Sequence, residues 1–117
     1  MGNWSETTGW KTRTSWLADH CILPSIGVLT LELRIEDAHS LKEKRHVVKG
    51  LKDRLRSRHN VSVAEIDYQD VWQRSVIAAV TVSADRNRAE AVLQVVEREA
   101  ANLLGGMLVG SSVEWVD

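Results

Sequence analysis

The sequence predicts an α+β fold in which two helices cover one face of a four-stranded antiparallel sheet. Three observations lead to this prediction. Strands are indicated by apolar residues at every second position, helices are indicated by apolar residues three or four positions apart, and the patterns follow the order strand, helix, strand, strand, helix, strand. The chain has 117 residues, of which 44% are hydrophobic, and this length suits one domain with one core.

The first strand is predicted near residues 26–35, where two sets of residues alternate. The set predicted to be buried is Leu29, Leu31, Leu33 and Ile35. The first helix is predicted to begin after Ser40, because the sequence Ser-Leu-Lys-Glu is typical of a capping box. In such a box the Ser40 hydroxyl caps the helix and Glu43 reaches back to the N–H of Ser40. The helix is predicted to end near Asn60.

The second half of the chain predicts a hairpin, a helix and a final strand. Residues 61–67 and 71–83 are rich in β-branched residues and are expected to pair across a turn at residues 68–70. Asp85 is the predicted cap of the second helix, which is predicted to end at Gly105 and Gly106. The last strand is predicted over residues 107–116. This order of elements is that of the ferredoxin-like, or split βαβ, fold.

The first 24 residues differ in character from the rest. They are polar, rich in Ser and Thr, and show no sustained helix or strand period despite Trp4, Trp10 and Trp16. We therefore expect a flexible N-terminal extension over residues 1–24, dispensable for the fold, and a folded domain over residues 25–117. The three tryptophans leave a second interpretation open, in which the extension docks on this domain or on a partner.

Composition argues against several classes of protein. The formal net charge is −1, so any attraction to nucleic acid must come from the distribution of charge. Cys21 is the single cysteine, which excludes a disulfide framework within one chain. No stretch approaches the roughly 20 apolar residues that span a bilayer, and the N-terminus lacks a secretory signal. We expect a cytoplasmic protein without a membrane partner, cofactor or small-molecule ligand.

Three short motifs resemble those of the bacterial YlxP-like family. They are Asp-Ala-His-Ser-Leu-Lys-Glu-Lys-Arg at residues 37–45, Asn-Val-Ser-Val-Ala-Glu at residues 60–65 and Asp-Val-Trp-Gln-Arg at residues 70–74. The resemblance covers about residues 25–117 and implies a ferredoxin-like fold, but no established activity. Some members are encoded beside genes for transcription, translation initiation and ribosome maturation, so the resemblance implies a small RNA- or ribosome-linked protein. Members usually begin close to the first strand, and this chain departs from them in its N-terminal extension.

The first predicted helix carries the most distinctive charge pattern. Residues 39–60 hold eight of the chain's 15 lysines and arginines. Five of them are spaced three and four residues apart, so they form one stripe within about 80° of the helix circumference and about 20 Å long, with no acid inside it. This basic stripe consists of Lys42, Arg45, Lys49, Lys52 and Arg56.

The basic stripe has three interpretations. It can follow the phosphates of an RNA backbone without reading the sequence. It can instead bind an acidic protein, in which case the chain is a homo-oligomeric interaction module. It can also be only a solvated helix face, with Asp53 pairing with Lys49. The spacing does not separate these interpretations, and the family resemblance favours a non-enzymatic RNA- or ribosome-associated accessory factor.

The face of the predicted sheet that no helix covers is a candidate surface for binding a partner. If Val76, Val80 and their alternate neighbours face the helices, then Ile77 and Ala79 point away and leave an apolar patch that a second copy can cover. A homodimer is therefore expected. Trp72 is predicted to be a core anchor.

The chain has no Phe, and the predicted third strand lacks the basic-aromatic signature of RNA-recognition strands, which argues against base stacking on the sheet.

The sequence contains no arrangement typical of an enzyme. No Gly-rich phosphate loop, Cys-His pair or Ser-His-Asp order is present. A metal or acid-base cluster can be drawn from residues near the first helix and the hairpin, but their spacing is not diagnostic. These residues are Asp37, His39, His46, Glu65, Asp67 and Asp70. We expect no catalytic residue and no metal site.

Overall fold

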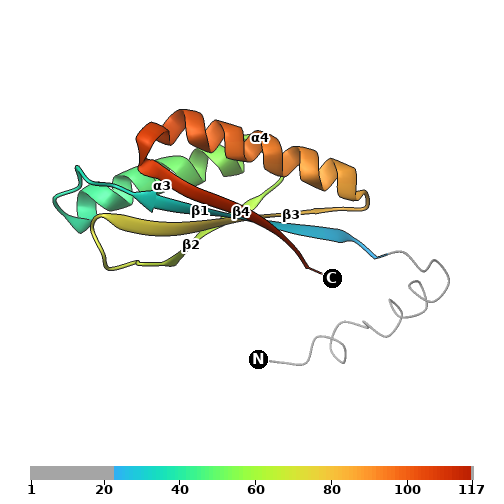
Figure 1. Ribbon diagram of the computed structural model, residues 1–117, viewed down its shortest axis with the longest axis horizontal. Helices are drawn as coiled ribbons and strands as arrows, with labels where there is room; N and C mark the ends of the chain where they lie inside the picture. The colour runs from blue at the N-terminus through green and yellow to red at the C-terminus, as the bar shows by residue number, and fades with distance from the viewer. Residues whose placement is uncertain (1–22, 117) are drawn as a thin grey trace, which may run out of the picture.

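The computed structural model describes residues 23–116, which form four strands and two long helices (Figure 1). The N-terminal extension predicted for residues 1–24 lies outside the described residues except for Leu23 and Pro24. With the labels of Figure 1, the elements are β1 (Ser25–Arg34), α3 (Leu41–Arg58), β2 (Ser62–Asp67), β3 (Arg74–Ser83), α4 (Arg86–Leu104), the 3-10 turn η1 (Gly105–Met107) and β4 (Leu108–Val116).

The four strands form one antiparallel sheet in the order β2-β3-β1-β4. Both helices cover the same face of this sheet, as Figure 1 shows, and no helix of the described residues lies on the opposite, open face. The predicted ferredoxin-like α+β fold is thereby confirmed. Between residues 23 and 116, no helix is long and apolar enough to cross a membrane.

The core lies between the sheet and the two helices. Leu29, Leu31 and Leu33 of the central strand β1 are fully buried, because alternate residues of a strand point to the same face. Burial of each such side chain stabilises the fold by roughly 1.5–3 kcal/mol. The helices contribute apolar residues three or four positions apart, namely Val48, Leu51 and Leu55 from α3 and Ala89, Leu93, Val96 and Ala100 from α4.

The predicted orientation of β3 is wrong. Ile77 and Ala79, predicted to face away from the helices, are fully buried beneath them. The cause is the pairing with β1, in which Leu31 lies opposite Ile77 and Leu29 lies opposite Ala79, because opposite residues of an antiparallel pair share a face. The open face instead carries the other alternate set, and the predicted self-association would have to use these residues: Val76, Ala78, Val80 and Val82.

The loop between β2 and β3 also differs from the prediction. β3 begins at Arg74 and not at Val71, so Trp72 lies in the loop and is 50% exposed, whereas it was predicted to anchor the core. Tyr68 adopts a φ of 60°, in the left-handed region that few residues other than glycine enter. The guanidinium of Arg74 lies 4.3 Å from the centroid of the Tyr68 ring, a cation–π contact that holds the turn against the strand.

The helix ends follow the predicted signals with one difference. The Ser40 hydroxyl accepts a hydrogen bond of 3.1 Å from the N–H of Glu43, as the capping box predicts. The Glu43 carboxylate accepts from the N–H of His39 at 2.6 Å, one residue earlier than predicted. Asp85 and Gly105 cap α4 at its two ends, as predicted.

One charged residue occupies a core position on the sheet-facing side of α3. Lys44 is 1% exposed, and its ammonium nitrogen lies 2.9 Å from the Oε2 atom of Glu65 on β2. The same ammonium donates to the backbone carbonyls of Tyr68 and Gln69 in the hairpin turn. Glu65 in turn accepts a hydrogen bond of 2.5 Å from the Ser75 hydroxyl. Every donor of the buried ammonium therefore has a partner, which buried charges require.

Replacing Lys44 by Met is expected to lower the free energy of unfolding by about 3 kcal/mol, because the Glu65 carboxylate and the turn carbonyls lose their partner. Chemical denaturation measures this change. The matched variant Lys42→Met removes an exposed lysine from the same helix turn, and we expect it to cost less than about 0.5 kcal/mol. Adding Glu65→Gln to Lys44→Met is expected to restore part of the loss. Equal effects of the two lysine variants would contradict a structural role for Lys44.

Candidate nucleic-acid interface

The five residues of the basic stripe lie together on the solvent-facing side of α3. Four of them are exposed and Lys52 is half-buried. Their position follows from the residues that α3 buries, which fix how the helix is rotated about its axis; these are Lys44, Val48, Leu51 and Leu55. The structure thus brings Lys42, Arg45, Lys49, Lys52 and Arg56 onto one surface.

An acid adjoins the stripe, and the pairing of Asp53 with Lys49 considered from the sequence is present. Asp53 lies 2.7 Å from the ammonium of Lys49 through Oδ2 and 2.6 Å from the guanidinium of Arg56 through Oδ1. The hydrogen bond from Lys49, helped by the positive charges of Lys49 and Arg56, lowers the pKa of Asp53. The carboxylate is therefore charged at neutral pH and neutralises part of the stripe.

The remaining three stripe residues, Lys42, Arg45 and Lys52, form no ion pair within residues 23–116. We call them the unpaired cations. Glu43, next to Lys42 in the chain, accepts a hydrogen bond from the N–H of His39 at the helix start. The unpaired cations are therefore the part of the stripe most available to an anionic ligand.

A second acid, Glu99 of α4, contacts three basic residues at the end of α3. Glu99 of α4 lies 2.9 Å from Nε2 of His59, 3.3 Å from Nε of Arg54 and 4.0 Å from a guanidinium nitrogen of Arg58. The hydrogen bond from His59 is the main cause that lowers the pKa of Glu99, and the neighbouring arginines act in the same direction. This contact ties the end of α3 to α4 and directs Arg54 and Arg58 away from the stripe.

Glu99→Gln is expected to reduce stability in a pH-dependent way. Because the pKa of Glu99 is lower in the folded chain than its ordinary value of 4.5, its contribution is present above that value and is lost as the pH falls through the folded pKa. At pH 7 we expect a loss of about 1 kcal/mol or less, since the partners are partly exposed. Urea unfolding at pH 7 and pH 3 measures the effect.

The control for this experiment is Glu90→Gln, which changes an exposed carboxylate on the same helix that has no ion pair within the described residues. It is expected to leave stability nearly unchanged at both pH values. A Glu99→Gln deficit that is equally large at pH 3 would mean that lost packing, and not the charge, causes it.

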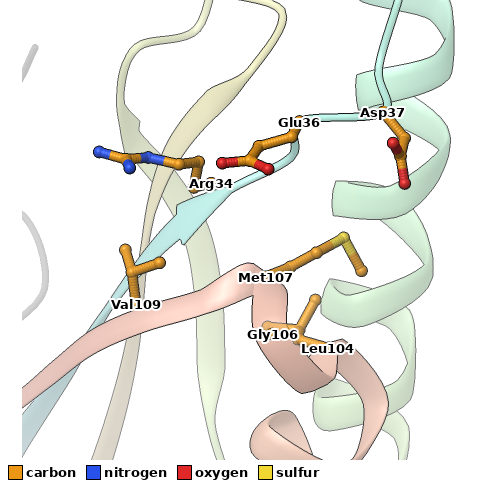
Figure 2. Close-up of a pocket in the computed structure, with 7 residues that line it drawn as sticks. All are labelled: Arg34, Glu36, Asp37, Leu104, Gly106, Met107 and Val109. Carbon is orange, nitrogen blue, oxygen red and sulfur yellow. The ribbon is translucent and has the colours of Figure 1, made fainter.

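A separate hollow of about 370 Å³ lies where β1 ends and β4 begins (Figure 2). In Figure 2 the carboxylates of Glu36 and Asp37 lie on one side of it, and the apolar side chains of Leu104, Met107 and Val109 lie on the other. Its lining contains no histidine, cysteine or hydroxyl group. The hollow therefore offers two carboxylates and the guanidinium of Arg34, an arrangement that by itself does not indicate a reaction.

Two of the acidic residues considered for a metal cluster, Glu65 and Asp67, have other contacts. In the part of the chain that the structure describes, no three His, Cys, Asp or Glu side chains lie close enough to hold a metal ion. Glu65 pairs with Lys44, and Asp67 accepts a hydrogen bond of 2.7 Å from the N–H of Tyr68. These contacts stabilise the hairpin and its turn.

Two residues of this region were missed from the sequence. Lys44 had a signal, because it continues the three-four spacing of the buried residues of α3. Glu99 had none, because it belongs to another helix. The second partner of Asp53, Arg56, also had a signal, since it lies three residues after Asp53 on the same helix.

The element order and the sheet order place the chain among ferredoxin-like α+β proteins. It is similar to the de novo designed protein Foldit4 with a TM-score of 0.52 and 14% identity, over 81% of this chain and 98% of that one. It is also similar to the de novo designed protein LFR1 1 with ferredoxin fold, with a TM-score of 0.42 and 11% identity, over 79% of this chain and 82% of that one. These likenesses concern the fold alone.

The chain belongs to the family described as "Protein of unknown function (DUF503)", whose model matches residues 26–113. It is also 46% identical, over 69 residues, to the "Uncharacterized protein YlxP" of Bacillus subtilis (strain 168). That match covers 59% of this chain and 75% of the relative. The resemblance to the YlxP-like family is thereby confirmed, and the family description names no activity.

Proposed function

We propose that the protein binds RNA through the basic stripe of α3 and acts as a non-enzymatic accessory factor of RNA or of the ribosome. The observation that carries this proposal is the set of unpaired cations, Lys42, Arg45 and Lys52, on one surface of a chain whose net charge is −1. Phosphate groups are the partners that such cations bind most strongly in nucleic acids.

The form of the surface favours contacts to phosphates over contacts to bases. A straight row of cations about 20 Å long can follow several phosphates of one strand, but such contacts do not distinguish bases. The open face of β3 presents Val76, Ala78, Val80 and Val82, which are not the aromatic rings on which bases stack. The family resemblance supports RNA as the nucleic acid concerned.

Asp53 makes binding an exchange of partners. Lys49 and Arg56 can reach a phosphate only by releasing the Asp53 carboxylate, whereas the unpaired cations bind without such a release. Exposed ion pairs of this kind contribute little to stability, so the exchange costs little. Arginine can then hold a phosphate with two parallel hydrogen bonds. Asp53 therefore tunes the affinity of the stripe.

Changing Lys42 and Arg45 together to Glu is expected to weaken RNA binding at least about tenfold at low salt, because two phosphate contacts become repulsive. Fluorescence anisotropy with a labelled single-stranded RNA of mixed sequence measures the affinity. With about four phosphate contacts at roughly 0.7 each, the parent should show a slope of log affinity against log salt near −3. For the double variant, the slope of log affinity against log salt should be about −1.5.

The matched control changes Arg88 and Arg98 to Glu, two exposed cations of α4 that alter the net charge by the same amount. Its RNA affinity should stay within about threefold of the parent, since only long-range charge is altered. Equal losses in both double variants would contradict a defined site on α3. Binding to poly-glutamate without binding to RNA would favour the second interpretation, an interaction module with an acidic protein partner.

Asp53→Asn is expected to strengthen RNA binding about threefold, because it frees Lys49 and Arg56 and removes a negative charge beside the phosphates. The control Asp70→Asn removes an equivalent exposed charge from the hairpin loop and should change the affinity little. The same titration at several salt concentrations separates the effect of the freed cations from the effect of the removed negative charge. Weaker binding by Asp53→Asn would show that Asp53 orients the cations and does not compete with the ligand.

A further inference from the structure

β4 forms one edge of the sheet, and within residues 23–116 no strand pairs with its outer side. It is nine residues long, its sequence LVGSSVEWV contains no Lys or Pro, and its pairing is irregular only near its start, opposite Leu33. The other edge strand, β2, has six residues and a shift between Glu65 and Asp67. Short length, lysine, proline and bulges are the usual protections of an edge. β4 therefore offers an edge to which another strand can pair.

Three hollows follow β4 from its first residues to its last. The hollow of about 370 Å³ shown in Figure 2 includes Val109 near the start of the strand. A hollow of about 290 Å³ lies between the middle of β4 and α4, lined by Val113, Trp115 and the buried Leu93. A third, of about 150 Å³, includes Val116 at the end. Side chains on the helix side of a strand added beside β4 would face the middle hollow, because Val113 and Trp115 of β4 point to that side.

The middle hollow is acidic. Glu90 and Glu97 both line it, and neither forms an ion pair among the described residues. The Ser111 hydroxyl of β4 donates a hydrogen bond of 2.6 Å to Glu97, which holds that carboxylate beside the strand. The residues that line the middle hollow include no cation, and Arg86, which lines the third hollow, lies 4.3 Å from the centroid of the Trp115 ring, towards the end of β4. The centre of the groove therefore favours a positively charged side chain.

We propose that the free edge of β4 binds an extended segment of a partner protein that carries a lysine or arginine flanked, two residues away on each side, by apolar residues. The backbone of this segment would pair with β4 and provide affinity, as in other cases of strand addition. Its basic side chain would lie opposite Val113, between Glu90 and Glu97, and the apolar side chains two residues away would lie beside Ser111 and Trp115 on the same face of β4. This site is separate from the basic stripe and does not depend on the proposed RNA binding.

A second copy of the chain fits this edge less well. An antiparallel pair of β4 strands would continue the sheet and place both α4 helices on the same face, beside the seam. Glu90 and Glu97 of the two copies would then face the same seam, where like charges repel. A partner segment with a central cation meets the same carboxylates with the opposite charge.

The test uses a soluble nine-residue peptide in which valine and threonine alternate and the central residue is lysine. It is titrated into the isotope-labelled full chain, and amide NMR shifts are followed. We expect saturable shifts concentrated in β4 and the neighbouring side of α4. Glu90→Lys should weaken binding at least about threefold, whereas Asp70→Lys, with the same charge change in the hairpin loop, should not. Proline in place of the threonines removes N–H donors and should abolish binding.

Several results would overturn the proposal. One is the absence of shifts in β4 at millimolar peptide. Another is equal weakening by Glu90→Lys and Asp70→Lys, which would reduce the effect to overall charge. Undiminished binding of the proline peptide would exclude strand pairing. Sedimentation that shows a dimer of the chain alone, dissociated by the peptide, would assign the edge to a second copy.

Discussion

The buried ion pair between Lys44 and Glu65 determines how α3 lies on the sheet. Apolar contacts alone allow a helix some rotation and sliding, because they have little directional preference. The ammonium of Lys44 instead meets three oxygen atoms in fixed directions, from β2 and from the turn after it. This contact fixes the rotation of α3 about its axis and, at the same time, the position of the hairpin turn. Which cations of α3 face solvent follows from that rotation, so the surface of the helix depends on this contact together with the buried Val48, Leu51 and Leu55.

The cations of α3 lie in four environments. Lys44 pairs with Glu65 inside the fold, Arg54 and Arg58 approach Glu99 of α4, and Lys49 with Arg56 approach Asp53. The unpaired cations are the fourth group and form no ion pair within the described residues. A count of lysines and arginines therefore overstates the electrostatic potential that a ligand meets, and the location of the unpaired cations matters more than their total.

Opposite charges gather in two separate regions of the domain. The basic stripe lies on the outer side of α3, whereas Glu90 and Glu97 line the groove between α4 and the edge strand β4. A net charge of −1 conceals this division. The separation gives the small domain two surfaces of opposite charge. Between them the sheet supplies a rigid base, since its central strand is fully buried on the helix side.

The sequence by itself determined the order of the elements, the caps at Ser40 and Asp85, the end of α4 at Gly105 and the spacing of the basic stripe. These features are local, because they depend on residues within one or two helix turns or on the alternation along one strand. Only the tertiary structure decided which face of β3 is buried, since both alternate sets of that strand are apolar and the pairing of Ile77 with Leu31 selects between them. It also decided that Lys44 is a core residue, because Glu65 and the turn carbonyls that make its burial tolerable come from another part of the chain. The same holds for Glu99 and for the β4 groove, which exist only where elements distant in the sequence meet.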